Sequence, residues 1–380
     1  MTEKLSIAYV FDSTYKPAEG VARYIETLGE YYREQGHNVS YIVGSSIYDN
    51  PSVYPVARMV SVKANGNHVD LPLPISKRKA RDLLEKIRPD ILHIQAPYGP
   101  IGWRFANEAS KETAIIGTFH SVPKSTMDKL RHNAIGMLSR RSLRHFDRMI
   151  SVSPAAKEVA LNTYGIDSEV IPCPVNLNKF KVGKRLHQYD DGKFNIVFLG
   201  RLEERKGCQH LLSAVGLIDV STLSKTRVII AGDGPLLPKL QLQSSSLGLD
   251  EAVSFLGFID DEKVADLFAS ADIAVFPATG GESFGIILVE AIASGAGVVI
   301  GGDNAGYRFV LGDNKYLFDP TNEKSLAQYL TRIISYPKGL VESHAYQHKE
   351  LGRFDVAIVG SKIMEIYKTI LKKKKSTKTL

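Results

Sequence analysis

Two glutamates stand eight positions apart in the stretch GGESFGIILVE, residues 280–290. Glu282 follows two glycines, a helix is predicted to begin near Ser283, and Glu290 lies about 12 Å further along the axis if the intervening residues are helical. The paired carboxylates of a retaining glycosidase lie only about 5 Å apart. A pair so widely spaced instead suits two hydroxyl-bearing groups on either side of a phosphate.

The start of this predicted helix can bind an anion. The backbone amides of residues 284–286 have no partner within such a helix and point outwards. Room for a phosphate to approach the backbone comes from three glycines, Gly280, Gly281 and Gly285. A nucleotide sugar has the matching order of hexose, diphosphate and ribose. The alternative is a capping acid at Glu282 and a solvated helix residue at Glu290, which explains either glutamate alone but gives the glycines no role.

The stretch GRLEERKG, residues 200–207, supplies the opposite charge. Arg201 and Lys206 follow a predicted strand, and a fixed pair of cations would neutralise a diphosphate and stabilise it as a leaving group. The alternative is a solvated run of charges, because Glu203, Glu204 and Arg205 are expected to include exposed residues.

Strand-like and helical segments alternate nearly from end to end of the chain. The predicted strands are SIAYVFD, NVSYIVGS, DILHIQAP, TAIIGTFHS and SEVIPCP in the first half, and FNIVFLGR, TRVIIAGDG, AVSFLGF, DIAVFPA and GVVIGGD in the second. This alternation predicts an α/β protein with parallel sheets in two doubly wound domains. Ligands bind such sheets at the carboxyl ends of the strands, where the glycine-rich and polar loops of this chain follow.

A proline-bearing, polar stretch after the first series of strands marks a domain boundary. We expect an N-terminal domain over residues 1–171, a linker over 172–192 and, over 193–354, a second domain that carries the predicted nucleotide-sugar site. An amphipathic helix over 355–371 is expected to pack back onto the first domain, and a basic tail follows over 372–380.

The composition is that of a soluble globular protein, with 44% hydrophobic and 23% charged residues among 380. The longest apolar windows are far shorter than the ~20 residues that a membrane-spanning helix needs. Since the N-terminus also lacks the pattern of a signal peptide, we predict a cytoplasmic protein. Cys173 and Cys208 have no metal-ligand spacing, and no metal site is expected.

The net charge of +7 is concentrated at the C-terminus, where five lysines stand within the last nine residues without an acid. They are Lys372, Lys373, Lys374, Lys375 and Lys378. Such a tail is predicted to be disordered and solvated, with an anionic membrane surface or nucleic acid as alternative partners.

Taken together, the two glutamates, the GR…RKG loop and AGDGP resemble the retaining glycosyltransferases of family 4, in the same order and over essentially the whole chain. The resemblance is strongest to bacterial phosphatidylinositol mannosyltransferases, which share GGESFGI(V/I)LVEA. It implies the GT-B fold, in which two Rossmann-like domains face a central cleft, and a site that forms as the domains close on the donor.

The resemblance also implies roles for individual residues. Glu282 would hold hydroxyls of the donor sugar and Glu290 the ribose, while Arg201 and Lys206 would bind the diphosphate. The catalytic residues that it implies are His120, Glu282, Arg201 and Lys206. The donor-binding residues that it implies are Gly20, Gly281, Ser283, Phe284, Gly285 and Glu290.

Two of these residues belong to the first half of the chain. Gly20, in the loop after the first strand, would let the backbone approach the phosphates, and His120 in GTFH would lie beside the sugar. For His120 the alternative is a structural histidine at the end of a strand.

A basic helix is predicted within ISKRKARDLLEKIRP, where Leu83, Leu84 and Ile87 form an apolar stripe. Such a helix can lie on an anionic lipid surface. In the phosphatidylinositol enzymes that the chain resembles, a basic amphipathic helix in this place brings the protein to its lipid acceptor. The residues assigned to the membrane and acceptor side are Lys77, Arg78, Lys79, Arg81 and Lys124. A soluble helix packed by its leucines, with its lysines in water, is the alternative.

The expected function is retaining transfer of a hexose to a lipid or glycan acceptor at the inner face of the cell membrane. GDP-mannose is favoured over UDP-linked donors, and neither a cofactor nor nucleic acid is expected as a partner. The alternatives are a transferase that uses a UDP-sugar and a soluble acceptor, and a non-catalytic GT-B protein that binds anionic lipid or polymer. Departures from the family's pattern, such as Gln95 where a second histidine often stands, leave the acceptor open.

Overall fold

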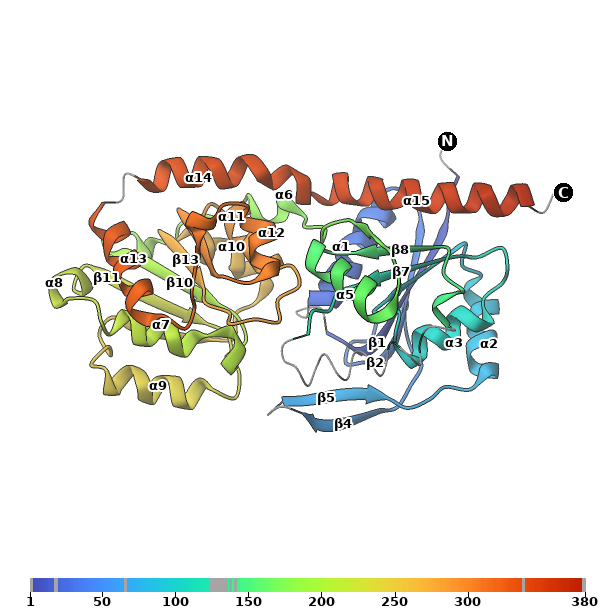
Figure 1. The fold of residues 1–380 in the computed structure, drawn as a ribbon, viewed down its shortest axis with the longest axis horizontal. Coiled ribbons are helices and arrows are strands. Elements are labelled where there is room, and N and C mark those ends of the chain that lie inside the picture. The colour runs from blue at the N-terminus through green and yellow to red at the C-terminus, as the bar shows by residue number, and fades with distance from the viewer. Residues whose placement is uncertain are drawn as a thin grey trace. The chain divides into compact units, whose positions relative to one another are not determined.

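The structure, a computed structural model, describes residues 3–16, 20–64, 67–123, 136, 139, 142–336 and 339–377. The chain forms two compact units. Unit 1 comprises the residues up to Pro174 together with those from Val356 onward, and unit 2 comprises Val175–Asp355. Each unit is built around one parallel sheet (Figure 1). None of the helices in the described ranges is long and apolar enough to cross a membrane.

Unit 1 contains a seven-stranded parallel sheet in the order β3-β2-β1-β6-β7-β8-β9. The strands are β1 (Ser6–Tyr15), β2 (Asn38–Ser46), β3 (Val53–Pro55), β6 (Ile91–Gln95), β7 (Ala114–Phe119), β8 (Arg148–Ser151) and β9 (Glu169–Val170). A separate antiparallel pair consists of β4 (Met59–Ala64) and β5 (Asn67–Pro72). The helices are α1 (Gly20–Glu34), α2 (Lys77–Ile87), α3 (Pro100–Glu108), α5 (Pro154–Tyr164) and α15 (Val356–Thr377).

Unit 2 contains a six-stranded parallel sheet in the order β12-β11-β10-β13-β14-β15. The strands are β10 (Phe194–Leu199), β11 (Thr226–Ala231), β12 (Val253–Gly257), β13 (Ile273–Phe276), β14 (Val298–Gly302) and β15 (Leu317–Phe318). The α-helices are α6 (Leu177–Phe180), α7 (Cys208–Val215), α8 (Val220–Leu223), α9 (Leu237–Ser246), α10 (Asp261–Ala269), α11 (Ile286–Ala293), α12 (Ala305–Leu311), α13 (Glu323–Ser335) and α14 (Gly339–Glu350). The short 3-10 helices are η1 (His187–Tyr189), η2 (Glu204–Lys206), η3 (Asn314–Tyr316) and η4 (Leu351–Phe354).

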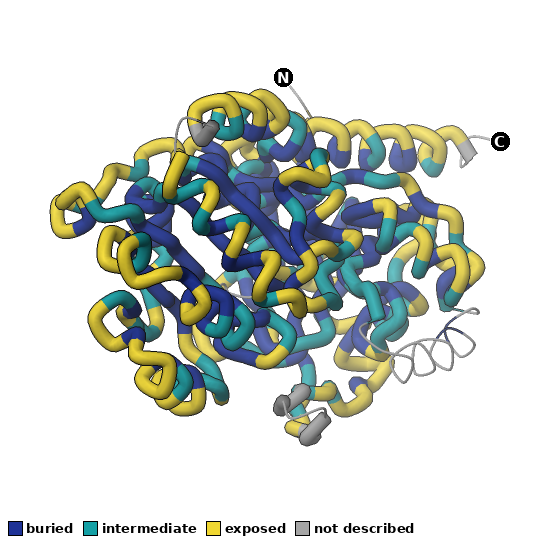
Figure 2. Tube along the Cα trace, turned by 60° about the vertical axis from the view of Figure 1, so that its left-hand side comes forward, coloured by how far each residue is buried: buried dark blue, intermediate teal, exposed yellow. Residues whose placement is uncertain are grey.

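The central strands are buried because helices cover both faces of each sheet. Every residue of β6, β7 and β13 is buried, which explains why these segments read as continuous apolar runs. Figure 2 shows the buried strands against the exposed outer sides of the helices. The predicted α/β architecture with two doubly wound domains is therefore confirmed.

Strand order reverses at one point in each sheet. The candidate site lies at the reversal point of the sheet in unit 2. In unit 2, β10 lies between β11 and β13, so the loops after β10 and β13 diverge at the switch point where doubly wound sheets bind ligands. The first loop is GRLEERKG and the second contains Glu282. In unit 1 the reversal lies between β1 and β6.

The predicted linker and the predicted basic tail both differ from the sequence prediction. The chain enters unit 2 after Pro174, so residues 175–192, predicted as a linker, are part of that unit. They bury Leu177 and Phe180 in unit 2, and burial of these apolar side chains explains the difference.

The predicted basic tail is also not separate, because α15 continues without a break through Thr377. Two ion pairs hold its last turns to unit 1. Lys374 Nζ lies 2.9 Å from Asp147, and Lys375 Nζ lies 2.8 Å from Glu3. The described part of the lysine run is therefore helical and not a disordered segment.

Asp12, near the end of β1, caps α3 from another element. Its two carboxylate oxygens accept hydrogen bonds from the backbone amides of Ile101 and Gly102, both at 3.0 Å. Gly99 is required beside it, because a Cβ there would lie 2.1 Å from Asp12 Oδ2. Burial raises the pKa of Asp12 to about 6, although the two amides act in the opposite direction.

This raised pKa predicts that Asp12 makes folding depend on pH. The folded state favours the protonated carboxyl, so its contribution to stability is complete below pH ~4 and is lost as the pH rises through about 6. Between pH 4 and 7.5 we expect the free energy of unfolding of the wild type to fall by roughly 2–3 kcal/mol relative to that of Asp12→Asn. Urea unfolding of both proteins at the two pH values measures this difference. Equal pH dependence in the two proteins would contradict it.

Candidate active site

Glycines shape the loop that carries Glu282 after β13. Gly281 has a φ of 71° and Gly285 a φ of 99°, backbone conformations that other residues rarely adopt. Gly285 is the N-cap of α11, so the helix begins at Ile286, later than the sequence predicted. The unpaired amides of the helix start are shifted accordingly, and only the residues from Ile286 to Glu290 are helical, so the ~12 Å expected for a continuous helix between the two glutamates does not apply.

The Glu282 carboxylate is held between two cations. Its Oε1 accepts hydrogen bonds from Lys206 Nζ at 2.7 Å and from Arg205 Nη1, and its side chain is 12% exposed. Burial raises the pKa of the Glu282 carboxyl, but the charges and hydrogen bonds of Lys206 and Arg205 outweigh burial and hold the pKa below its ordinary value. The carboxylate is therefore ionised at neutral pH, and the three groups carry a net charge of +1.

The sequence paired Lys206 with Arg201, whereas the structure pairs it with Arg205. Arg201 is 62% exposed, and its Nε lies 3.6 Å from Glu203. Arg205 is only 26% exposed and Glu203 only 7%, so the charge run is not simply solvated. The turn η2 brings the adjacent Arg205 and Lys206 to the same carboxylate. Two neighbouring cations in RKG were the signal that sequence reasoning missed.

Close backbone contacts hold three loops together at this end of the sheet of unit 2. Gly207 has a φ of 76°, and a Cβ there would lie 1.9 Å from the carbonyl oxygen of Pro277. A Cβ at Gly232, in AGDGP, would lie 2.0 Å from the carbonyl oxygen of Gly200. The glycines of both motifs thus allow the loops after β10, β11 and β13 to touch, which positions the cations beside Glu282.

Other predicted donor-binding residues of unit 2 are more buried than expected. Phe284 is 2% exposed, and its ring packs on Phe309 and Phe354 with centroid distances of 6.0 and 5.4 Å. Its side chain belongs to the core, so only its backbone is available to a donor. Glu290 is 1% exposed, which rules out the alternative of a solvated helix residue. Ser283 is half-buried.

His120 stands at the end of β7 in a network of buried polar side chains. Its Nε2 lies 2.7 Å from Gln95 Oε1 on β6, and the Gln95 amide nitrogen lies 3.4 Å from the carbonyl oxygen of His93. Burial lowers the pKa of His120 to about 3, so the ring is neutral at physiological pH. With the Gln95 oxygen directed at Nε2, that nitrogen carries the proton and Nδ1 is left as an acceptor. Gln95, noted in the sequence only as a departure, is thus the partner of His120.

Gly20 is the first residue of α1, and no described atom lies close to the position that its Cβ would take. A Cβ added there would meet no atom within 4 Å among the described residues. The glycine is therefore not required by packing in this part of the structure, in contrast to Gly207.

The basic helix α2 uses its apolar side for the core of unit 1. Leu84 is buried, and Leu83 and Ile87 are partly buried against the same core cluster, so most of the predicted apolar stripe is packed in unit 1. This matches the alternative of a helix packed by its leucines. The cations remain on the outside: Arg78 is 91% exposed and Arg81 is 61% exposed. Lys124 lies outside the described residues.

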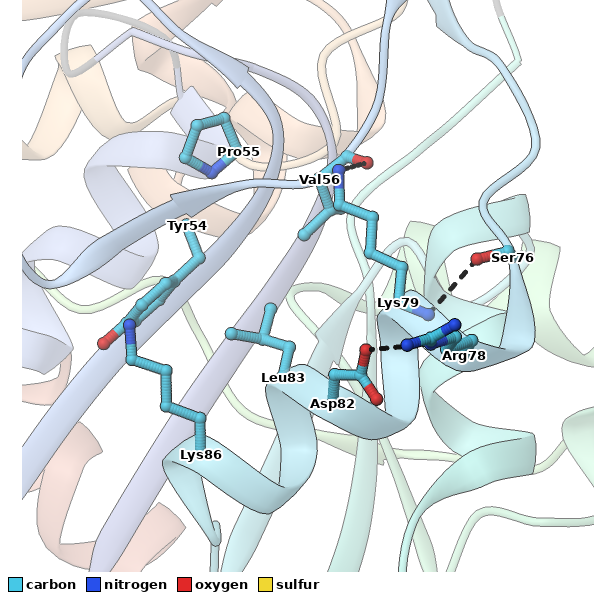
Figure 3. Close-up of a pocket in the computed structure, with 9 residues that line it drawn as sticks. All are labelled: Tyr54, Pro55, Val56, Ser76, Arg78, Lys79, Asp82, Leu83 and Lys86. Atoms are coloured by element: carbon cyan, nitrogen blue, oxygen red, sulfur yellow. Dashed lines mark hydrogen bonds and ion pairs between the residues drawn. The ribbon is translucent and has the colours of Figure 1, made fainter.

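A groove of about 450 Å³ runs beside α2 (Figure 3). Lys79 Nζ donates to the carbonyl oxygen of Val56 at 2.7 Å, and Lys86 Nζ lies 5.1 Å from the centre of the Tyr54 ring. Arg78 Nε lies 3.8 Å from Asp82. The Arg78–Asp82 pair is exposed and contributes little, whereas the hydrogen bond of Lys79 is partly buried. No cluster of three or more metal-ligating side chains occurs among the described residues.

Comparison with known proteins agrees with this arrangement. The family model for Glycosyltransferase Family 4 matches residues 18–179, and the model for Glycosyl transferases group 1 matches residues 183–350. Phosphatidyl-myo-inositol mannosyltransferase of Mycobacterium tuberculosis is 31% identical over 361 residues, covering 92% of this chain and 93% of that protein. The GDP-mannose-dependent alpha-(1-6)-phosphatidylinositol dimannoside mannosyltransferase of the same species is 24% identical, covering 85% of this chain and 86% of that protein.

A solved structure, the sucrose-phosphate synthase from Thermosynechococcus elongatus, has a TM-score of 0.74 at 18% identity, covering 96% of this chain and 99% of that one. This similarity concerns the fold. The two parallel-sheet units are those of GT-B glycosyltransferases. With both family models matched and 31% identity over 92% of its length, the chain belongs to the family 4 glycosyltransferases.

Proposed function

We propose that the protein transfers mannose from GDP-mannose to an inositol phospholipid, with retention of the anomeric configuration. The observation that carries the proposal is the carboxylate of Glu282 beside Lys206 and Arg205 at the switch point of unit 2. A carboxylate accepts hydrogen bonds from sugar hydroxyls, and the two cations suit a diphosphate. The choice of donor and acceptor is supported by the names of the mannosyltransferases to which the chain is similar.

The roles of the groups follow from their charges. Lys206 and Arg205 would exchange Glu282 for the diphosphate as the donor binds and would stabilise it as it leaves, and Arg201 would add to this positive field. Glu282 would then be free to hold hydroxyls of the sugar. Glu290 is the proposed ribose contact, and because it is almost fully buried, that contact requires its carboxylate to become accessible when the donor binds. No cofactor is needed in this scheme.

Retention is proposed to proceed on a single face of the sugar. The acceptor hydroxyl would attack from the side on which the diphosphate leaves, and a phosphate oxygen would take its proton. Neutral His120 is proposed to lie beside the sugar with its Nδ1 as a hydrogen-bond acceptor.

The contact with Gln95 predicts a specific effect on catalysis. Gln95→Leu removes the acceptor that fixes the His120 ring, so we expect the turnover rate to fall roughly 10- to 100-fold with little change in thermal stability. Gln95→Glu keeps an oxygen in this place and should recover much of the loss. Steady-state kinetics of the three proteins tests this. Equal activity of the two variants would show that Gln95 acts through packing alone.

Because no described atom lies near the Cβ position of Gly20, a substitution there is predicted to affect donor binding without affecting stability. Gly20→Ala should leave the thermal midpoint unchanged but weaken GDP-mannose binding roughly tenfold, because a methyl group would stand where the phosphates approach. Gly352→Ala is the matched control, since a Cβ there also meets no atom within 4 Å among the described residues. Isothermal titration of both variants measures the effect. Wild-type affinity in Gly20→Ala would remove this residue from the proposed site.

Membrane docking through α2 is part of the proposal. Because the apolar stripe of α2 is packed in unit 1, docking would depend on its outward cations, Lys77, Arg78, Lys79 and Arg81, and would weaken as salt is added.

One experiment tests the function as a whole. The purified protein is incubated separately with GDP-mannose, UDP-glucose and UDP-N-acetylglucosamine, and the thermal shift and nucleotide release are recorded with and without phosphatidylinositol vesicles. We expect stabilisation by GDP-mannose and release of GDP that rises when vesicles are added. Stabilisation by a UDP-sugar alone would favour the alternative donor. Vesicle binding without any donor effect would favour a non-catalytic lipid-binding protein.

A further inference from the structure

The lysine-rich end of the chain is anchored in unit 1 as part of α15. One side of this helix is buried through Ile363, Met364, Tyr367, Ile370 and Leu371. The Tyr367 hydroxyl lies 2.6 Å from His93 Nδ1, and the Tyr32 hydroxyl donates to the carbonyl oxygen of Gly360 at 2.8 Å. The helix is thus fixed by core contacts along its length.

The opposite side of α15 is strongly basic. Between Ser361 and Ser376, Glu365 is the one acid among the exposed positions that the structure describes. The exposed lysines of this face are Lys362, Lys368, Lys372, Lys373 and Lys375. Figure 2 shows the exposed outer side of the helix that ends at the C-terminus. Like charges one turn apart repel each other, so this face is stabilised when an anion neutralises it.

Three of these lysines line a groove of about 550 Å³ between α15 and the start of β1. Lys368, Lys372 and Lys375 follow one another at helical spacing, and Leu5 and Leu371 supply apolar surface beside them. Lys375 is paired with Glu3. The ammonium groups of Lys368 and Lys372 have no ion-pair partner in the part of the chain that the structure describes.

The last turn of α15 is positioned before any ligand binds. Lys374 Nζ lies 2.9 Å from Asp147 and donates to the carbonyl oxygen of Lys111 at 3.3 Å. These contacts hold the helix end against unit 1, so little ordering is required of the neighbouring lysines on binding.

We propose that this face of α15, centred on Lys368 and Lys372, binds the phosphate of an anionic lipid headgroup and forms a membrane contact of unit 1 separate from α2. Lysine binds phosphate as a point charge, and lysine clusters on an amphipathic helix are attracted to anionic leaflets. Because the apolar side of α15 is buried in unit 1, the helix rests on the lipid surface without inserting. The choice of a lipid over another phosphate carrier rests on the proposed function.

The test compares two double variants of the full chain. Lys368→Gln with Lys372→Gln removes the two groove lysines, and Lys239→Gln with Lys324→Gln removes two exposed helix lysines of unit 2 as a matched control. Co-flotation with phosphatidylcholine vesicles that contain phosphatidylglycerol is measured at low and high salt. At low salt we expect roughly 25-fold weaker binding for the first variant, about fivefold per lysine, and near wild-type binding for the control. High salt should abolish the difference.

Each other outcome identifies what is wrong with the proposal. Equal vesicle binding by the two variants would overturn it. Stabilisation of the wild type but not of the groove variant by inorganic phosphate alone would assign the site to a free anion. If the groove variant lost as much affinity for duplex DNA as for the vesicles, the face would be a general polyanion surface. That result would also overturn the lipid assignment.

Transfer to a short-chain, monomeric acceptor should be the same in both variants, since neither touches the candidate active site. If no protein transfers sugar, the proposed function fails, while the flotation comparison still decides whether α15 binds lipid.

Discussion

Replacing Glu282 with glutamine is expected to lower sugar transfer roughly 10²- to 10³-fold while GDP binds at least as tightly as to the wild type. The carboxylate offsets one of the two positive charges of Lys206 and Arg205 and accepts a hydrogen bond from each, so its loss leaves both cations free for the diphosphate. The same substitution removes the negative charge that would hold the sugar hydroxyls. Transfer kinetics and titration with GDP, measured on the same preparation, separate the two effects.

A matched control is Glu251→Gln, which removes an exposed acid of the same unit. It should leave both transfer and GDP binding unchanged. If Glu282→Gln transferred sugar at the wild-type rate, the carboxylate would be only the structural counter-ion of Lys206 and Arg205, and the proposed donor site would be wrong.

Gly207→Ala is expected to destabilise unit 2 strongly, and more than Gly248→Ala does. The residue has a φ of 76°, which costs an L residue about 1–2 kcal/mol, and a Cβ would lie 1.9 Å from the carbonyl oxygen of Pro277. Relief of that contact requires the loops after β10 and β13 to move apart. The total cost is expected to exceed about 4 kcal/mol, and donor binding should be lost with it.

Gly248→Ala separates the two causes of this loss. Gly248 has a φ of 68°, yet a Cβ there meets no atom within 4 Å among the described residues. Gly248→Ala should therefore lower the free energy of unfolding only by the backbone cost of a left-handed conformation, about 1–2 kcal/mol. Denaturant unfolding of both variants provides the comparison, and equal destabilisation would show that the contact with Pro277 is easily relieved.

The sequence pattern predicted the main strands well because buried parallel strands are continuous apolar runs. β10, β11 and β13 lie within the segments predicted for them. β8 was missed, since its four residues RMIS follow a long basic stretch and are too few to show a period. The antiparallel pair β4 and β5 was also missed, although the two residues between them in the sequence are Asn65 and Gly66, a strong hairpin signal.

The candidate site was only partly predictable for a different reason. Glu282 and Lys206 stand out in motifs, but the choice of Arg205 over Arg201 depends on the direction of a single turn, η2. The contact between His120 and Gln95 depends on strand register, because Gln95 pairs with Thr118 across β6 and β7. Contacts between distant segments are set by packing, which local patterns do not contain.

The most direct test of the central claim is a product analysis. The protein is incubated with GDP-mannose and phosphatidylinositol vesicles, the lipids are extracted, and mass spectrometry with proton NMR identifies the product and its anomeric configuration. We predict a phosphatidylinositol that carries one α-linked mannose with the wild type and hardly any with Glu282→Gln. A β-linked product would contradict retention. Bound GDP-mannose without any mannosylated lipid would contradict the proposed acceptor.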